Sequence, residues 1–445
     1  MSSVQKLLIT AIVGVILLVG VAASCPSVCS CTSDSNGVHV NCSSRGLHSI
    51  PGNLSTNTYV LNLTHNEISV IEDNDFSNLP SLQYLDLHQN KITSIKSDSF
   101  NNLTKLKVLY LHENRITSIK SNTFNNLGNL IRLDLDNNYI SVIEDNNFNN
   151  LPNLTYLYLH QNRITSIISD MFNKLSKLVD LFLHENSITS IKSDTFNNLI
   201  NLRRLLLHEN RITSIKSDTF NNLGNLIRLN LDNNYISVIE DNNFNNLPNL
   251  TYLYLYGNKI TSIKSDMFNN LTNLKLLSLR NNPISFVSES AFVNLPKLTS
   301  LDLHMYCGGC ENIPFWRWLR KQTTTSVTCN DYDGKSLSNL QLSNFTGCFP
   351  STKSDDNYTA VYIGIGASIV AALIVVIIVL VTLRYRRKKQ QSDTTRVRGI
   401  SPTMISEVHH TEPHCVSAIP MVQEQHYDTI QTPPAVSYIK YNKSA

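Results

Sequence analysis

The chain contains a unit of 24 residues that recurs many times without any change of length. One asparagine and one phenylalanine of the unit each return ten times in the same register. This repetition constrains the fold more than any other feature of the sequence. The asparagines are Asn66, Asn90, Asn114, Asn138, Asn162, Asn186, Asn210, Asn234, Asn258 and Asn282, and the phenylalanines are Phe76, Phe100, Phe124, Phe148, Phe172, Phe196, Phe220, Phe244, Phe268 and Phe292.

The unit is clearest over residues 82–105, where it reads LQYLDLHQNKITSIKSDSFNNLTK. The alternation around Leu85 and Leu87 is typical of a strand, so Tyr84 and Asp86 should face the other way. One such strand cannot bury its leucines alone, whereas stacked copies can. We therefore predict a solenoid in which about eleven strands form one parallel sheet over a continuous leucine core.

The recurring asparagine and phenylalanine have different expected tasks. The chain turns inward after each strand, where water cannot reach its backbone groups, and a buried asparagine amide can satisfy them. The phenylalanines should stack on the opposite side of the core. That side is expected to be the wider one, which would curve the stack so that the sheet lies on the concave face.

The run LxxLxLxxNxLxxLxxxxFxxL resembles the extracellular leucine-rich repeat family in its 24-residue typical form, over residues 25–348. The resemblance implies an α/β solenoid shaped as a horseshoe, with a cysteine cap at 25–57, repeats over 58–306 and a second cap at 307–348. The caps and repeats are similar to those of Slit-type proteins and the variable lymphocyte receptors of jawless vertebrates. This implies recognition or adhesion, with innate immunity as one form of it.

Eight cysteines flank the repeats, and an even number after an apolar leader indicates disulfides formed in an oxidising compartment. Zinc binding by the first four is the alternative, but no histidine or second CxxC lies at ligand spacing. The second cap also contains Trp316, Trp318 and Leu319, expected on a short helix that covers the last repeat. The resemblance implies the pairs Cys25–Cys31, Cys29–Cys42, Cys307–Cys329 and Cys310–Cys348.

The two ends of the chain indicate a single-pass type I protein of the plasma membrane. Residues 1–24 read as a signal peptide, with a retained anchor as the alternative. After a polar stalk at 349–359, residues 360–383 are uncharged and long enough to span a bilayer.

Five basic residues follow the span, so the tail at 384–445 should be cytoplasmic. We also expect this tail to be disordered. In that tail, Tyr427 and Ile430 form a candidate adaptor-docking or phosphorylation motif.

Sequons for N-glycosylation are frequent before the predicted membrane span. Asn41 adjoins Cys42 and is not counted among the expected sites. Asn62 is unusual because strand alternation directs it to the concave face. The expected sites are Asn53, Asn62, Asn102, Asn153, Asn249, Asn270, Asn344 and Asn357.

Charge and motifs exclude several classes of function. The tail carries a net charge of +4 and the rest of the chain −1, so nothing favours a nucleic-acid ligand. No catalytic constellation, cofactor motif or metal site is expected.

One repeat position holds a histidine six times. Three of these histidines, His160, His184 and His208, lie on consecutive strands. Acidification to about pH 6 should protonate them, so that their charges repel one another. The alternative is that they are independent solvated side chains. They are His88, His112, His160, His184, His208 and His304.

The outward strand positions give the candidate ligand-binding surface. Tyrosine and arginine, which anchor many protein interfaces, are frequent there, although outward tyrosines can simply favour strands. We expect the centre at Tyr156, Tyr158, Phe182 and Arg204. A receptor for another protein or a glycan is the first hypothesis, and a protein that adheres to copies of itself is the second. The candidates are Tyr110, Arg132, Asp134, Asp136, Tyr156, Tyr158, Asp180, Phe182, Arg204, Arg228, Tyr252, Tyr254 and Tyr256.

An internal duplication marks where this surface varies. Residues 127–167 and 223–263 are nearly identical at an offset of 96 residues, or four repeats. The first three of their four differences fall on the concave face or its edge, where a binding surface would be tuned. The differences are Asp134/Asn230, His160/Tyr256, Gln161/Gly257 and Arg163/Lys259.

Overall fold

The computed structural model describes residues 25–240, 243–265, 267–321, 325–345 and 348. These belong to the first of two compact units, which divide between Thr352 and Lys353. The expected leader, stalk, span at 360–383 and tail, with Asn357, Tyr427 and Ile430, lie outside them. Within the described ranges, no helix has the length and apolar character needed to cross a membrane.

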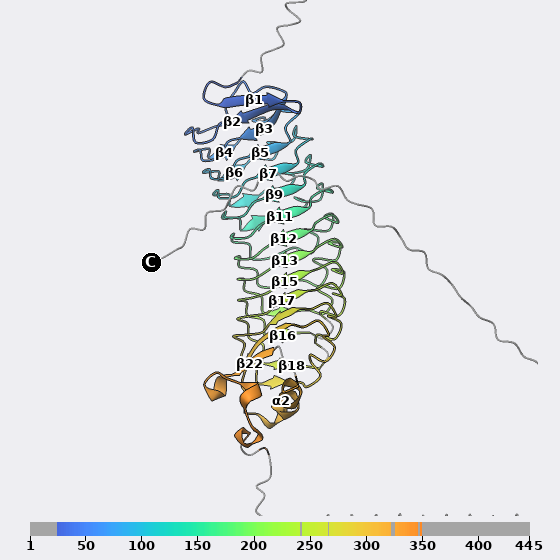
Figure 1. Cartoon of the computed structure of the whole chain (residues 1–445). Helices are drawn as coiled ribbons and strands as arrows, with labels where there is room; N and C mark the ends of the chain where they lie inside the picture. Colours follow the sequence, from blue (N-terminus) through green and yellow to red (C-terminus); the bar gives the residue numbers. More distant parts are fainter. Residues whose placement is uncertain (1–24, 241–242, 266, 322–324, 346–347, 349–445) are drawn as a thin grey trace, which may run out of the picture. The chain divides into compact units, whose positions relative to one another are not determined.

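One sheet of fifteen strands runs through the repeats and both caps (Figure 1). Its strands are parallel from β2 to β22, and the outermost pairs β1–β2 and β22–β23 are antiparallel. Eleven of them, β3 to β21 in sheet order, come from the repeats, which confirms the predicted parallel solenoid. The strands are β1 Ser30–Asp34, β2 Gly37–Asn41, β3 Thr58–Asn62, β5 Tyr84–Asp86, β7 Val108–Tyr110, β9 Arg132–Asp134, β11 Tyr156–Tyr158, β12 Asp180–Phe182, β13 Arg204–Leu206, β15 Arg228–Asn230, β17 Tyr252–Tyr254, β19 Leu276–Ser278, β21 Ser300–Met305, β22 Thr325–Cys329 and β23 Lys335–Ser336.

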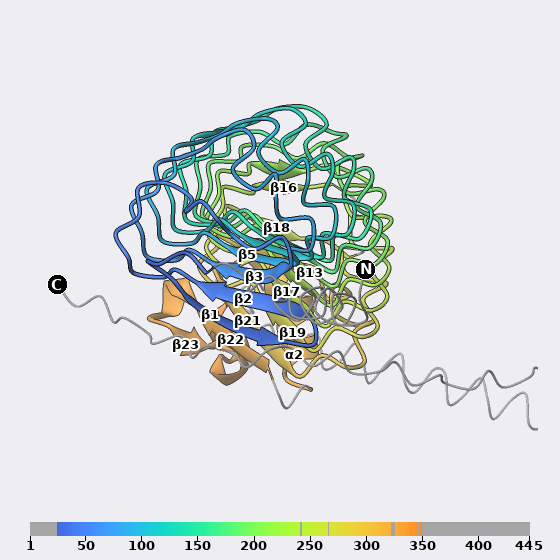
Figure 2. The ribbon, with the colours of Figure 1, turned by 90° about the horizontal axis from the view of Figure 1, so that it is seen from above.

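Short strands on the returning part of the coils form four two-stranded parallel pairs. They align neighbouring coils after the turn that follows each main strand, and Figure 2 shows the coils stacked in register around a common interior. The pairs are β4 Val70–Ile71 with β6 Ser94–Ile95, β8 Ser118–Ile119 with β10 Val142–Ile143, β14 Ser214–Ile215 with β16 Val238–Ile239, and β18 Ser262–Ile263 with β20 Phe286–Val287.

The core explains why the repeat region curves. Leu85, Leu87 and their equivalents are at most 2% exposed. On the opposite side the phenylalanines form one continuous stack, as predicted, with ring centroids 6.4 Å apart between Phe148 and Phe172. Parallel strands lie only about 4.8 Å apart. Because the phenylalanine side is more widely spaced, the repeats curve with the main sheet on the concave face.

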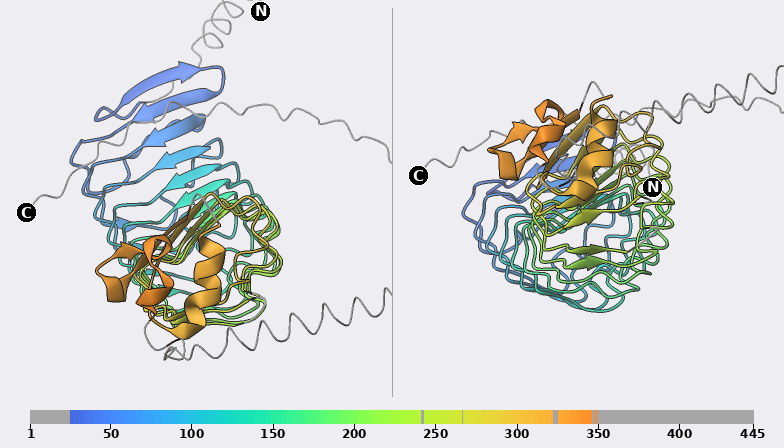
Figure 3. Two further views of the ribbon diagram at one scale, coloured as in Figure 1. Left: turned by 60° about the horizontal axis from the view of Figure 1, so that its bottom comes forward. Right: turned by 90° about the horizontal axis from the view of Figure 1, so that it is seen from below.

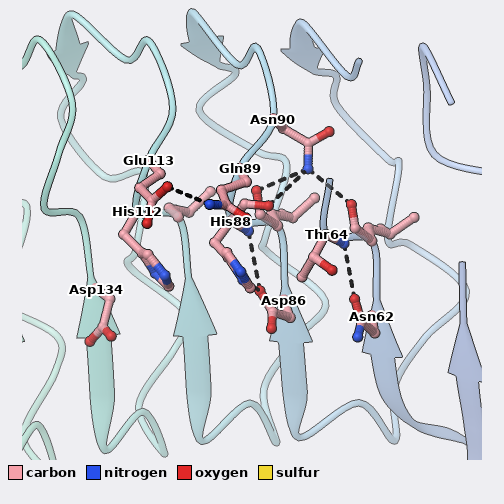
Figure 4. Close-up of polar contacts among 12 residues, drawn as sticks. Asn62, Thr64, Asp86, His88, Gln89, Asn90, His112, Glu113 and Asp134 are labelled. Atoms are coloured by element: carbon pink, nitrogen blue, oxygen red, sulfur yellow. Dashed lines mark hydrogen bonds and ion pairs between the residues drawn. The ribbon is translucent and has the colours of Figure 1, made fainter. Parts of the chain in front are cut away.

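The repeated asparagine bonds the backbone of two coils at once. Asn138 Nδ2 donates to the carbonyl oxygens of Leu135 at 3.1 Å and of Leu111, one coil earlier, at 3.0 Å. Its Oδ1 accepts the Ile116 backbone N–H at 3.0 Å. Figure 4 shows the amide of Asn90 reaching the same kind of carbonyls. Each coil is therefore joined to the one before it by buried hydrogen bonds that water cannot replace.

Disulfide-bonded caps close both ends of the core. The cysteine pairs are those that the resemblance implies: Cys25–Cys31, Cys29–Cys42, Cys307–Cys329 and Cys310–Cys348. Helix α2 (Ile313–Leu319) lies across the end of the last coil (Figure 3) and buries Trp316 and Leu319, as predicted. Four 3-10 turns complete this cap: η1 Cys310–Asn312, η2 Asn330–Tyr332, η3 Leu337–Asn339 and η4 Leu342–Asn344.

Candidate ligand-binding surface

The concave face carries a continuous stack of rings and guanidinium groups across five neighbouring strands. The Arg132 guanidinium carbon lies 5.2 Å from the Tyr110 ring centre and 4.9 Å from that of Tyr158. Tyr158 stacks on Phe182 with centroids 4.5 Å apart and planes only 6° from parallel. Arg204 covers the far side of Phe182 at 5.4 Å. We call these five residues the aromatic stack, and its members hold one another in place by dispersion and cation–π attraction.

Two carboxylates of the predicted surface are hidden by their partners. Arg132 holds Asp134 through hydrogen bonds of 2.8 to 3.1 Å, and Asp134 is 3% exposed. Asp180 is fully buried and is bound by Arg204 from the next strand, with Nε to Oδ1 at 2.6 Å. Asp134 and Asp180, which we expected to face outward, are therefore turned to arginines instead of to solvent, because a buried carboxylate needs a cation and takes the nearest arginine.

Next to the aromatic stack the concave face has a pocket of about 590 Å³. It lies over strands β11 to β17, and we call it the arginine pocket. Tyr156 and Arg204 border one side, and Tyr252 and Tyr254 border the other. The lining residues are Tyr156, Val179, Asp180, Arg203, Arg204, Ile227, Arg228, Tyr252 and Tyr254.

The charges of the arginine pocket are not balanced. Arg204 is paired with Asp180, but within the described residues neither Arg203 nor Arg228 forms an ion pair with a carboxylate. Arg228 packs over the Tyr254 ring at 4.8 Å, and its Nε is buried without a hydrogen-bond partner in the described part of the chain. A second hollow of about 430 Å³, which shares Arg203, adds two lysines at the rim. With three arginines and one aspartate in its lining, the pocket presents an excess of positive charge to an anion.

The duplication explains why Arg228 is unpaired. Arg132 and Arg228 are equivalent residues 96 positions apart, and each packs on an equivalent tyrosine at almost the same distance, 4.9 and 4.8 Å. The first copy has Asp134 two residues after its arginine, and the second has Asn230. One of the four differences between the copies thus removes the carboxylate that would neutralise Arg228.

The remaining predicted residues fall into distinct positions. Tyr156, Arg204, Arg228, Tyr252 and Tyr254 border the arginine pocket. Tyr256 lies at the edge, where its hydroxyl accepts a hydrogen bond from Asn281 at 2.7 Å.

Sequence reasoning missed Arg203, because it precedes strand β13 and so stands outside the alternating strand positions. Its only signal is its place directly before an outward arginine. Basic residues just before a strand line the adjoining hollow in the same way, as Lys275 does.

The histidine column is a stack of half-buried rings instead of separate solvated side chains. Ring centroids lie 4.3 Å apart between His160 and His184 and 4.2 Å apart between His184 and His208. Burial, and next the neighbouring rings, lower the pKa of His184 to about 3. Burial also lowers the pKa of His160 and His208. The expected charging of this column near pH 6 is therefore wrong for His184, which stays neutral there.

The predicted glycosylation sites that are described lie mostly on the surface. Asn102, Asn249, Asn270 and Asn344 are exposed. Asn62 is half-buried in β3 on the concave face, where its Oδ1 accepts the Thr64 backbone N–H at 2.9 Å (Figure 4). Asn53 and Asn153 complete the described set, and their occupancy stays a prediction.

Comparison with known proteins identifies the repeats. The family model described as "Leucine rich repeat" matches residues 56–116, 104–164, 152–207, 200–260 and 255–305. Together these segments cover more than half of the chain. The chain belongs to the leucine-rich repeat family. The resemblance found in its sequence is thereby confirmed.

Curated relatives in this family match a short part of the chain. Leucine-rich repeat-containing protein 3 of Rattus norvegicus is 45% identical over 64 residues, which are 14% of this chain and 25% of the relative. Leucine-rich repeat-containing protein 4C of Homo sapiens is 42% identical over 62 residues, which are 14% of this chain and 9% of the relative. The chain thus spans at most about a quarter of these two relatives.

Solved leucine-rich repeat structures align over more of the chain. A chain of the octameric complex of latrophilin 3, Unc5D and FLRT2 is 27% identical with a TM-score of 0.61, covering 73% of this chain and 100% of that one. An internalin of Listeria monocytogenes is 28% identical with a TM-score of 0.52, covering 65% and 79%. The Toll–Spatzle complex, 23% identical with a TM-score of 0.56 and covering 62% and 39%, shows the shared fold alone.

Proposed function

We propose that this chain is a cell-surface recognition receptor that binds an extracellular protein through its concave sheet, with an acidic group of the ligand in the arginine pocket. The observation that carries this proposal is the pair of arginines, Arg203 and Arg228, that share one pocket and form no ion pair with a carboxylate among the described residues.

The pocket suits such a ligand in shape and chemistry. Tyr252 and Tyr254 supply broad faces with a polar group, and the guanidinium groups supply donors in a fixed plane. Arg204 is kept in place by Phe182 of the aromatic stack and by its ion pair with Asp180. A site whose donors are held before the ligand arrives loses less entropy when the ligand binds.

The comparisons support a protein ligand outside the cell. FLRT2 is the leucine-rich repeat component of an octameric complex with latrophilin 3 and Unc5D. The sequence supports a matching location, with a leader at 1–24, a span at 360–383 and a basic stop after it. We therefore place the protein in the plasma membrane as a single-pass type I chain, with Tyr427 as a candidate adaptor site. Innate immune recognition is part of this proposal on the resemblance alone.

The test displays the full-length chain on cells and screens it against soluble extracellular proteins and acidic glycans. The variant Arg203→Ala/Arg228→Ala should weaken binding of the selected ligand by at least tenfold. Arg211→Ala, which removes one exposed arginine outside the pocket, should leave binding unchanged.

Three outcomes would contradict the proposal. Equal binding by the double variant at normal surface expression would remove the arginine pocket as the site. Selection of glycans alone would replace the protein ligand by a glycan. Binding of the chain only to cells that display the same chain would support the second hypothesis, homophilic adhesion.

A further inference from the structure

A cluster of imidazole and carboxylate groups lies on the concave face outside the arginine pocket. We propose that His112, Asp136 and His160, together with one oxygen of Asp134, bind a single divalent transition-metal ion of the zinc type. Three of these residues occupy the same position of consecutive repeats, 24 residues apart, and the fourth lies two residues before Asp136. Figure 4 shows His112 beside His88, with Asp134 on the following strand.

The distances suit one ion. Ligand atoms of His112, Asp134 and Asp136 all lie within 4.8 Å of one another. His160 approaches Asp136 from the other side, with Nε2 at 3.5 Å from Oδ2. Zinc bonds to nitrogen and oxygen are about 2.0 to 2.2 Å long, so two ligands of one tetrahedral ion stand about 3.3 to 3.6 Å apart. His160 lies outside the group of three and would have to turn toward it to become the fourth ligand.

The cluster lacks positive charge. Asp134 is 3% exposed and Asp136 is 8% exposed, and Arg132 is the one arginine that binds either of them in the described part of the chain. Arg132 binds Asp134 and leaves Asp136 without an arginine among the described residues, so a bound cation would balance the second buried carboxylate.

The histidines supply imidazole nitrogen, a ligand atom that zinc accepts readily. Nε2 is the nitrogen of His160 that faces Asp136. Nδ1 of His112 and Nδ1 of His160 are buried without a hydrogen-bond partner among the described residues, as is Nδ1 of His184 and of His208 outside the cluster.

Other charged groups around the cluster have mixed effects. Glu113 and Glu185 add negative potential near Asp136 and His160. Arg132 opposes the metal, since it already holds both oxygens of Asp134. In the bound form Asp134 would give one oxygen to the ion and keep the other for Arg132.

The internal copy supplies a natural control. At the positions equivalent to 112, 134, 136 and 160 it has His208, Asn230, Asp232 and Tyr256. Two of the four differences between the copies thus replace a carboxylate and an imidazole by weaker ligands. Asp232 is bonded instead to the Tyr256 backbone N–H at 2.7 Å. The second copy keeps the fold but lacks two of the four proposed ligands. A metal ion should therefore bind the first copy and not the second.

A second group of potential ligands does not compete within the described residues. Cys307, Cys329 and Asp331 lie close together, but both sulfur atoms are consumed by a disulfide. Cys415 and the histidines of the tail, together with histidines elsewhere such as the exposed His48, are sources of background binding, which the variants below subtract.

The experiment titrates the purified full-length chain with ZnCl₂ after removal of metals by dialysis against a chelator. Bound zinc is counted by elemental analysis and affinity by calorimetry. Wild type should bind one more ion per chain than Asp136→Asn, and the affinity for that ion should fall at least tenfold in the variant. Asp232→Asn, the same substitution in the second copy, should bind as wild type does.

A double variant keeps the result decisive if Asp136→Asn folds poorly. Asp134→Asn/His160→Tyr gives the first copy the residues that the second copy already accommodates, so its thermal unfolding should resemble that of wild type. It should lose the same single ion. Equal zinc content in wild type and a folded double variant, or equal loss in Asp232→Asn, would overturn the proposal.

Discussion

Arg132 and Arg228 occupy equivalent places in two nearly identical stretches of the chain, yet in the described part of the chain only Arg132 forms an ion pair with a carboxylate. Its partner Asp134 is replaced by Asn230 in the second stretch, while the tyrosine under each guanidinium is retained. Asparagine has almost the shape of aspartate but no charge. The amide of Asn230, in place of a carboxylate, thus leaves Arg228 at the pocket without an ion-pair partner among the described residues.

This relationship gives the most direct prediction about the ligand. Asn230→Asp should place a carboxylate beside Arg228 and weaken binding of an acidic ligand by at least tenfold, because Arg228 would then be neutralised as Arg132 is. Thermal unfolding should change little, since the first copy holds aspartate at this place. The measurement is ligand binding to the displayed full-length chain.

Asn233→Asp is the matched control for that variant. It adds the same charge to the same repeat at an exposed turn residue. Equal loss of binding in both variants would show a general charge effect and contradict a specific role for Arg228.

The repeated buried asparagines predict a large loss of stability when one of them is replaced. Asn138→Ala removes three donated hydrogen bonds and one accepted bond at buried backbone groups. We expect a loss of about 3 kcal/mol in the free energy of unfolding, since each unsatisfied buried group costs about 1 to 3 kcal/mol and water can replace part of the loss. Urea unfolding measures it, and Asn126→Ala at an exposed position should cost far less.

The phenylalanine stack should tolerate shortening poorly. Phe172 is 1% exposed and lies between Phe148 and Phe196, with ring centroids at 6.4 and 6.3 Å. Phe172→Ala should destabilise the fold by about 3 to 5 kcal/mol through lost burial and the cavity left behind. Ile200→Ala is the comparison, because that side chain is 53% exposed. A similar shift in the urea midpoint for both variants would show that the stack is not part of the core.

Asp232 predicts a pH dependence of defined sign. Burial raises the pKa of its carboxyl group from 3.8 to about 6, against the lowering effects of the Tyr256 backbone N–H and Arg228. Between about pH 4 and 6 the folded chain therefore holds a proton that the unfolded chain has lost, so this group stabilises the fold at low pH and opposes it above pH 6.

Asp232→Asn should thus raise the unfolding temperature at pH 7.5, and the gain should disappear as the pH falls to about 4. The amide keeps an oxygen for the Tyr256 N–H. Unfolding followed by circular dichroism at several pH values is the measurement, with the exposed Asp194→Asn as control. A gain that is constant with pH would exclude the raised pKa as its cause.

The coil architecture was determined by the sequence alone. Each of its elements depends on contacts with the neighbouring repeat, so the 24-residue period fixes its partners. The Asn138 hydrogen bonds, the stacking of Phe172 on Phe148 and the pairing of β11 with β12 all follow from that period. The cap cysteines pair as the resemblance implies.

The chemistry of the concave face was decided by the tertiary structure. Alternation along a strand shows which side chains leave the sheet, but not which of them cover one another. Arg132 bonds within its own strand, whereas Arg204 reaches back to the strand before it and buries Asp180. Strands only about 4.8 Å apart force outward side chains into contact. The charge and size of neighbouring side chains then decide which of them stay exposed. Arg228, which has no aspartate two residues after it, lies at the pocket as a result.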